Sequence, residues 1–171
     1  MTTTSDVRET VDRERLPERA PRLNLRELVP DVYKALFRLE AAVRAGLDPT
    51  IYELVKIRAS QINHCAFCLD MHSKDALASG ESVERLVQLS AWEESQHFYT
   101  AREVAALRLT EAITVLTEGF VPDEVYEEAA KYFDDTELAH LISSITSINA
   151  WNRLGVTARA AAGHHMPASS H

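Results

Sequence analysis

Signals that start and end helices recur along the chain, and they constrain its fold more than any other feature. Pro30 and Pro49 each stand in the first turn of a predicted helix, where the missing proline N–H is tolerated. Thr100 and Glu103 have the spacing of a capping box, which typically starts a helix. Gly80 is a typical helix end. Helices are predicted over residues 30–45, 49–62, 65–79, 82–92, 100–116, 122–133 and 136–161.

Strand signals are missing from the same sequence. No window of four or more residues alternates strongly between apolar and polar side chains with β-branched enrichment. Apolar residues instead recur at helical spacing, most clearly in the last predicted helix at Leu138, Leu141, Ile142, Ile145, Ile148, Trp151 and Leu154. We therefore predict an all-α fold, a compact bundle of about seven helices.

The chain divides into a long central part and two short ends. Residues 1–22 are polar, lack periodicity and contain Pro17 and Pro21, so they are predicted to form an extended or flexible arm. Residues 23–162 are predicted to form one helical domain, and 171 residues with 46% hydrophobic side chains suffice for a single core. Residues 163–171 are predicted to be a flexible tail.

Charge and hydropathy exclude several classes of protein. The net charge is −8 and no basic run is present, which argues against nucleic-acid binding. No apolar stretch approaches the roughly 20 residues of a membrane helix, and the N-terminus lacks the apolar core of a secretory signal. We expect a cytoplasmic protein with no membrane partner. Thiols stay reduced there, so two nearby cysteines indicate catalysis or metal binding rather than a structural disulfide.

The residues Cys65, Cys68 and His72 form the motif with the most chemistry. Their spacings of three and four place all three on one stripe of a helix. One sulfur can attack an oxidant while the other forms a disulfide with it. Unpaired N–H groups at a helix start favour a thiolate, and by this argument alone Cys65 is the more activated sulfur. His72 can hold or relay a proton near neutral pH, and His64 would add positive charge.

Glu53 is the candidate partner for proton transfer. It lies twelve positions before Cys65, on the helix face that also carries Ile57 and Ser60. A carboxylate among apolar neighbours such as Leu54 suits a general base or acid. Spacing alone makes this role a hypothesis.

The run from Glu53 to His72 resembles the alkylhydroperoxidase D-like branch of the carboxymuconolactone decarboxylase superfamily. The motif of that branch is a glutamate followed by Cys-x-x-Cys-x-x-x-His, and all four positions match here. The resemblance extends over the core from about Leu23 to Arg159, including the run 149–153 late in the last helix.

The resemblance implies a helical protein that assembles as a homo-trimer or homo-hexamer and reduces peroxides without a cofactor or metal. Cys68 would be the peroxidatic cysteine, Cys65 the resolving cysteine, and Glu53 and His72 would relay protons. An external dithiol, on a lipoyl-bearing or thioredoxin-like protein, would reduce the disulfide. Founding members carry a histidine directly before the second cysteine, where this chain has Phe67. This difference bears on the details of proton transfer.

Three alternatives stay open at this point. Cys65, Cys68 and His72 could bind zinc together with His64 or Glu53, although ligands crowded on one short helix make a poor tetrahedral site. Decarboxylation of a lactone acid, another reaction of the superfamily, needs no cysteine pair, and that branch typically lacks one. A redox-sensing oligomer without turnover would oxidise once and stop, whereas a peroxidase would cycle.

The remaining distinctive residues are assigned structural roles. Aromatic residues of the core or a subunit interface are Trp92, Phe98 and Trp151. Polar residues expected to support a pocket or interface are Asn149, Asn152 and Arg153. Single histidines expected in a loop or at the surface are His97 and His140, and the tail histidines are assigned no role.

Overall fold

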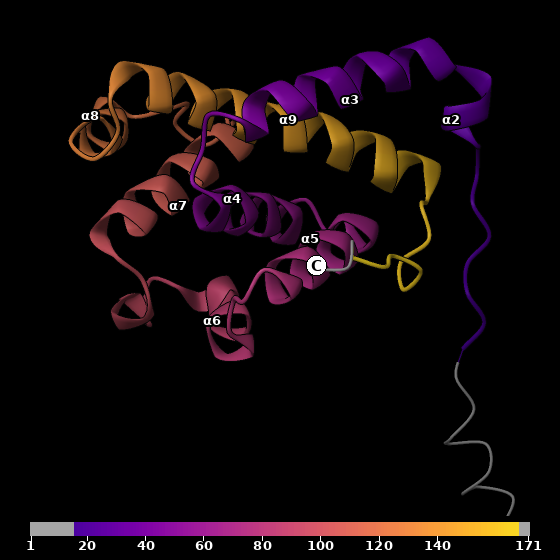
Figure 1. Cartoon of the computed structure of the whole chain (residues 1–171), viewed down its shortest axis with the longest axis horizontal. Coiled ribbons are helices and arrows are strands. Elements are labelled where there is room, and N and C mark those ends of the chain that lie inside the picture. The colour runs from indigo at the N-terminus through magenta and orange to yellow at the C-terminus, as the bar shows by residue number, and fades with distance from the viewer. Residues whose placement is uncertain (1–15, 168–171) are drawn as a thin grey trace, which may run out of the picture.

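The structure is a computed structural model that describes residues 16–167; the start of the predicted arm and the end of the predicted tail lie outside the described residues. Every regular element in this range is helical, which confirms the all-α prediction (Figure 1). The α-helices are α2 (Leu25–Leu28), α3 (Pro30–Arg44), α4 (Pro49–Ile62), α5 (Ala66–Ala78), α6 (Val83–Gln88), α7 (Ala101–Thr114), α8 (Asp123–Ala130) and α9 (Asp135–Ala158). Two short 3₁₀ helices, η1 (Leu89–Ala91) and η2 (Gln96–Phe98), lie between α6 and α7.

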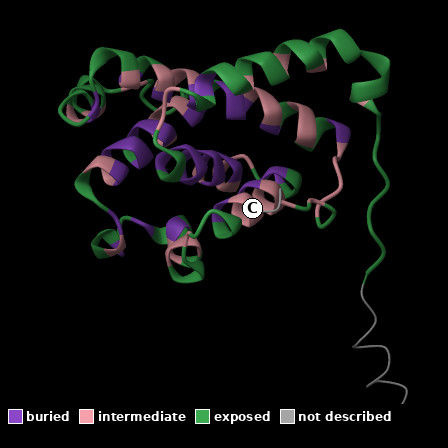
Figure 2. Cartoon of the chain, in the orientation of Figure 1, coloured by how far each residue is buried: buried purple, intermediate pink, exposed green. Residues whose placement is uncertain are grey.

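Helix α4 is the centre of the fold. It contacts α5, α7 and α9, and all residues from 51 to 57 are buried. Figure 2 shows α4 buried almost all round, whereas α3 and α8 keep exposed faces. Its first turn is capped by Asp48, whose carboxylate accepts from the N–H groups of Thr50 and Ile51 at 2.9 and 3.1 Å. Charged residues of α4 are therefore held inside the protein.

Two apolar clusters fix α4 in place. One joins it to α7, α8 and α9 through Leu109, Ala129 and Leu141. The other joins it to α5, η1 and α7, and its largest member is Trp92, which is 1% exposed. The Trp92 indole Nε1 donates to Glu111 at 2.6 Å, so its polar atom is satisfied. The prediction of a core role for Trp92 is confirmed.

Several helix boundaries differ from prediction. Helix α2 was not expected, α6 is short and continues as η1, and α7 ends at Thr114 rather than near residue 116. Helix α9 ends at Ala158 rather than near residue 161, because Arg159 adopts a left-handed φ of 58° that stops the helix.

His140, which was expected at the surface, is only partly exposed. Its side chain is half-buried, because its ring lies directly against Gly46 in the turn between α3 and α4. Any Cβ at Gly46 would overlap this ring, so the glycine permits close packing of the turn on α9. No helix among residues 16–167 is both long enough and apolar enough to cross a membrane.

Candidate active site

A tight reversal between α4 and α5 positions the two cysteines. Helix α4 ends at Ile62, and His64 takes a left-handed φ of 53°, so the predicted break at Asn63–His64 is confirmed. The Cys65 N–H donates to the Ser60 carbonyl at 3.0 Å, which returns the chain alongside the end of α4. Cys65 thereby becomes the N-cap residue of α5.

Side-chain amides fasten this reversal to α9. The Asn63 Nδ2 group donates to the Oδ1 atoms of Asn149 and Asn152, both at 2.9 Å. Asn152 in turn donates to the Ser60 Oγ at 3.0 Å, and Asn149 donates to the Thr114 Oγ1 at 3.1 Å. These bonds satisfy buried amides whose isolation would be costly. Sequence reasoning expected structural roles for Asn149 and Asn152 but did not identify Asn63 as their partner.

Cys65 and Cys68 form a disulfide in this structure, with Cα atoms 5.4 Å apart. Both residues are almost fully buried, at 1% and 2% exposure, in a cluster with Ile148 and Trp151 of α9. The Cys65 Sγ also accepts from the Cys68 N–H at 3.4 Å, which is a weak capping contact at the start of α5. The sulfurs therefore lie where the helix dipole favours negative charge.

Gly155 explains how α9 passes so close to the sulfurs. A Cβ added at this position would lie 3.1 Å from the Cys65 Sγ and 3.8 Å from the Cys68 Sγ. Glycine leaves this space free without needing an unusual backbone conformation. Its role was not predicted, because an isolated glycine in a helical sequence carries no signal of what lies opposite.

Glu53 and His72 meet as the motif suggested. His72 lies one turn after Cys68, and its Nδ1 is 2.8 Å from the Glu53 Oε2. Both residues are 6% exposed, so the pair is shielded from water. Among the hydrogen bonds of residues 16–167, none joins this pair to a sulfur, as expected for a disulfide with no proton to share.

A second buried charge cluster adjoins Glu53 on α4. Glu40 of α3 accepts from Lys56 at 2.5 Å, from Ser147 at 2.6 Å, from Trp151 at 3.0 Å, and from the Tyr52 hydroxyl. Lys56 is fully buried. Sequence reasoning missed this cluster, and its only signal was a lysine within an apolar stretch of helix.

The cluster stays charged because its members compensate one another. Burial would raise the pKa of Glu40, but the charge of Lys56 and the donated hydrogen bonds hold that pKa below its usual value. Burial lowers the pKa of Lys56, against the opposing charges of Glu40 and Glu53. Burial and the bond to Glu40 raise the pKa of Tyr52. A positive charge is therefore held one helical turn from Glu53.

A cavity of about 290 Å³ opens beside the disulfide. His64, Cys65 and Phe67 line it from the start of α5, and Gly155 and Arg159 line it from the end of α9. His64 is exposed and Phe67 is 36% exposed, so both supporting residues expected from the motif lie at this opening. A small reactant can approach the disulfide here.

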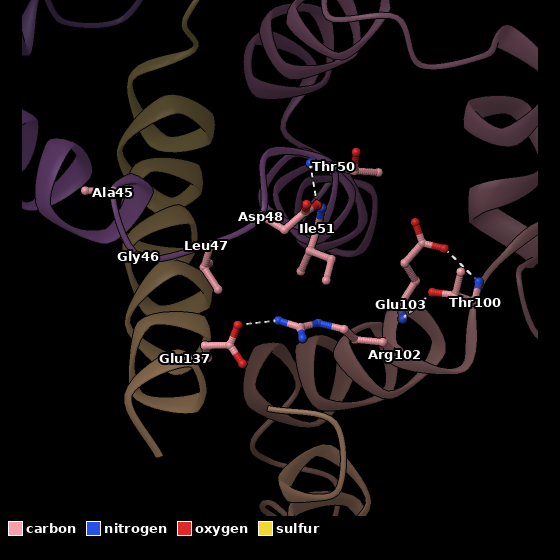
Figure 3. Close-up of a pocket in the computed structure, with 10 residues that line it drawn as sticks. All are labelled: Ala45, Gly46, Leu47, Asp48, Thr50, Ile51, Thr100, Arg102, Glu103 and Glu137. Atoms are coloured by element: carbon pink, nitrogen blue, oxygen red, sulfur yellow. Dashed lines mark hydrogen bonds and ion pairs between the residues drawn. The ribbon is translucent and has the colours of Figure 1, made fainter. Parts of the chain in front are cut away.

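A larger cavity of about 760 Å³ lies away from the cysteines, between the α3–α4 turn and the starts of α7 and α9 (Figure 3). Its polar groups already serve the fold: Asp48 caps α4, Thr100 and Glu103 form the capping box of α7, and Arg102 pairs with Glu137 at 2.7 Å. This cavity holds neither cysteine. Among residues 16–167, no cluster of three or more His, Cys, Asp or Glu side chains could hold a metal ion.

Comparisons with known proteins place these features in context. The model of the carboxymuconolactone decarboxylase family matches residues 30–112. The chain is 39% identical to the uncharacterized protein YdfG of Bacillus subtilis over 79% of this chain and 92% of that protein. It is 32% identical to the uncharacterized protein YnjA of Escherichia coli over 60% of this chain and 55% of that protein.

A solved structure is also similar. It is the crystal structure of a protein of unknown function from Agrobacterium tumefaciens, provisionally described as the antioxidant defence protein AhpD. The two chains superpose with a TM-score of 0.82 at 36% sequence identity, over 85% of this chain and 100% of the other.

Proposed function

Because the chain belongs to the carboxymuconolactone decarboxylase family and is similar to an alkylhydroperoxidase D-like structure, we propose that it is a thiol-dependent peroxidase. One observation carries the proposal: Cys65, which caps α5, forms a buried disulfide with Cys68, and His72, one turn after Cys68, is paired with the buried Glu53 of α4. This arrangement supports reversible dithiol chemistry more than lactone decarboxylation, which uses no cysteine pair.

The cycle begins from the reduced dithiol. Glu53 and His72 accept the proton of Cys68, and the start of α5 stabilises the thiolate. The Cys68 thiolate attacks the terminal peroxide oxygen, the O–O bond breaks, and an alcohol leaves after taking a proton from the pair. Cys68 becomes a sulfenic acid. The Glu53–His72 pair takes the proton of Cys65, the Cys65 thiolate attacks the Cys68 sulfur to form the disulfide, and the hydroxide that leaves takes this proton and becomes water.

The two sulfurs differ in their surroundings. Cys65 is the N-cap and lines the cavity, whereas Cys68 lies one turn before His72. Helix position favours Cys65 as a thiolate, and proximity to the proton relay favours Cys68. We assign the attack to Cys68, because an alcohol leaving group needs a proton and His72 can deliver it there. An external dithiol then reduces the disulfide, and lipoyl-bearing or thioredoxin-like proteins are candidate donors.

Steady-state turnover is the test of this function. Purified protein with excess dithiothreitol is expected to consume many equivalents of cumene hydroperoxide per dithiol, measured by loss of peroxide with time. Consumption that stops after one equivalent would contradict a peroxidase and indicate a redox sensor. No oxidation of the dithiol at all would contradict both.

Replacing Glu53 by glutamine tests the proton relay. The Glu53→Gln variant is expected to lose about 100-fold in peroxidase rate, because general acid–base catalysis contributes roughly 10²–10⁴-fold. The loss should appear at every pH tested, because a carboxamide can neither accept nor return the proton. Rates measured from pH 5 to 9 provide the check.

Glu103 offers a matched control for Glu53. It is also 6% exposed and buried against a cation, Arg85, but it lies away from the dithiol. Glu103→Gln should leave the rate at each pH in place even if it lowers stability. An unchanged rate in Glu53→Gln would exclude Glu53 from proton transfer.

A further inference from the structure

The cavity beside the disulfide is lined by one of its two cysteines. Cys65 is among the lining residues and Cys68 is not, although both are almost fully buried. Gly155 also lines the cavity, and a Cβ at that position would lie nearer to the Cys65 Sγ (3.1 Å) than to the Cys68 Sγ (3.8 Å). A disulfide is reduced by a thiolate that attacks one of its two sulfurs and expels the other. A thiolate that enters from this cavity therefore approaches the Cys65 side of the disulfide, and the Cys68 sulfur, one turn before His72, is the leaving group.

Positive charge surrounds this approach. Arg19 and Arg159 line the cavity, and His64 lies exposed at its edge. The charge of Arg19, followed by burial and the charge of Arg22, lowers the pKa of Arg159. Among the described residues that line the cavity, Glu18 is the one carboxylate, and it bonds to the His164 Nε2 at 2.8 Å. This positive cluster belongs to a chain whose net charge is −8.

Backbone contacts hold these arginines together. The Arg22 N–H donates to the Ala158 carbonyl at 2.8 Å, and its guanidinium donates to the Thr157 carbonyl at 3.2 Å. Arg159 adopts a left-handed backbone that is unfavourable for a long side chain, at the point where the arm meets the end of α9. Strained residues and crowded like charges are typical of sites that bind a ligand of opposite charge.

We propose that this cavity binds a small thiol or dithiol that carries a carboxylate, with the carboxylate at Arg19 and Arg159 and the attacking sulfur at Cys65. The inference rests on the proposed function, because it names the reductant class for the same disulfide. Phe67 and Val156 provide apolar wall for the carbon chain of the reductant. About 290 Å³ lies near the lower end of ligand cavities, roughly 300–1,000 Å³, and suits a small molecule.

One thiolate of the dithiol attacks the Cys65 Sγ, the Cys65–Cys68 bond breaks, and a mixed disulfide forms at Cys65 while the Cys68 thiolate leaves. The second thiolate of the reductant then attacks its own sulfur in the mixed disulfide and expels Cys65. Two electrons pass to the two cysteines, the reductant becomes a cyclic disulfide, and its two thiol protons remain with the protein or solvent.

Two probes with the same dithiol test the proposal. Dihydrolipoate carries a carboxylate where dihydrolipoamide carries a neutral amide. Oxidised protein is mixed anaerobically with each probe, without peroxide, and its free thiols are counted with time. Dihydrolipoate is expected to react about three- to tenfold faster at low salt, as for a partly exposed arginine–carboxylate contact. This advantage should shrink as ionic strength rises.

Variants of Arg159 assign the effect to this cavity. Arg159→Gln should remove the preference for dihydrolipoate, and Arg159→Lys should keep most of it. Arg102→Gln, which changes a cation in the other cavity, should leave the preference unchanged (Figure 3). Should Arg159→Gln fail to fold, Arg19→Gln provides the same comparison.

The outcomes separate this proposal from the peroxidase proposal. Equal rates for the two probes in the wild type, or an unchanged preference in both arginine variants, would overturn the carboxylate site. An intact, arginine-dependent preference in a protein that does not turn over peroxide would support the site and overturn the peroxidase.

Discussion

Serine at position 68 is expected to abolish peroxide turnover. The Cys68→Ser variant should lose a factor of at least roughly 10³ in rate, because removing a nucleophile removes the reaction path that depends on it. A serine hydroxyl one turn before His72 cannot form a sulfenic acid or a disulfide. Peroxide consumption with excess dithiothreitol, compared with the wild type at equal concentration, measures the loss.

Cys65→Ser is the matched control, because it removes the other sulfur of the same disulfide. This variant should still react once with peroxide and accumulate a sulfenic acid on Cys68, detected by dimedone labelling and mass spectrometry. Labelling of Cys65 in Cys68→Ser, with no labelling of Cys68 in Cys65→Ser, would reverse the two roles. Such a result would favour the helix-capping position over the proton relay as the source of reactivity.

Alanine at position 40 is expected to cause a larger loss of stability than the other single substitutions described above. Glu40→Ala leaves Lys56 buried without its direct carboxylate partner and also frees the donors of Tyr52, Ser147 and Trp151. Breaking a buried ion pair by removing one partner costs about 3–5 kcal/mol. Urea denaturation at pH 7, followed by tryptophan fluorescence, measures the change in the free energy of unfolding.

The stability that Glu40→Ala loses relative to the wild type, called its stability deficit, should depend on pH. The folded pKa of Lys56 lies below its ordinary value of 10.5, and losing Glu40 lowers it further. Between the lowered folded pKa of Lys56 and its ordinary value of 10.5, the unfolded chain binds more protons than the folded chain. The stability of the variant therefore rises with pH in that window. The wild type loses the contribution of Glu40 as pH falls below 4.5 and through its lowered folded pKa. The deficit is therefore largest near neutral pH and narrows on both sides.

A second substitution distinguishes the charge from the packing. Lys56→Met in the Glu40→Ala background removes the uncompensated cation at similar volume, and should restore part of the lost stability. A double variant less stable than Glu40→Ala would contradict the view that the unpaired Lys56 charge causes the deficit.

Local signals predicted the fold well because they act over a few residues. The proline at residue 49 and the capping box at residue 100 start α4 and α7 as expected. The end of α9 was misplaced, because Arg159 leaves the helical conformation where the arm crosses it, and that contact joins residues over 130 positions apart. A sequence pattern of helical period carries no record of such a contact.

In the candidate site, too, local spacing was predictable and contacts between distant helices were not. Spacing and resemblance together led to Glu53, Cys65, Cys68 and His72, and the structure brings Glu53 to His72 and Cys65 to Cys68, while their roles stay predictions. The supports from other helices were missed: Glu40 from α3 and Gly155 from α9. Neither residue is part of a recognisable motif in its own helix. Glu40 is important because it pairs with Lys56, and Gly155 because it leaves room for the two sulfurs.

The amide contacts of the α4–α5 reversal determine which helices would have to be transferred to rebuild this site in another protein. The matched family region ends at residue 112, and all four motif residues lie within it. Asn149, Asn152 and Gly155, which fasten the reversal and leave room for the sulfurs, lie beyond it in α9. A chimaera that borrowed only the motif-bearing helices would inherit the reactive groups without their enclosure. The smallest portable unit of this dithiol centre therefore includes the last helix.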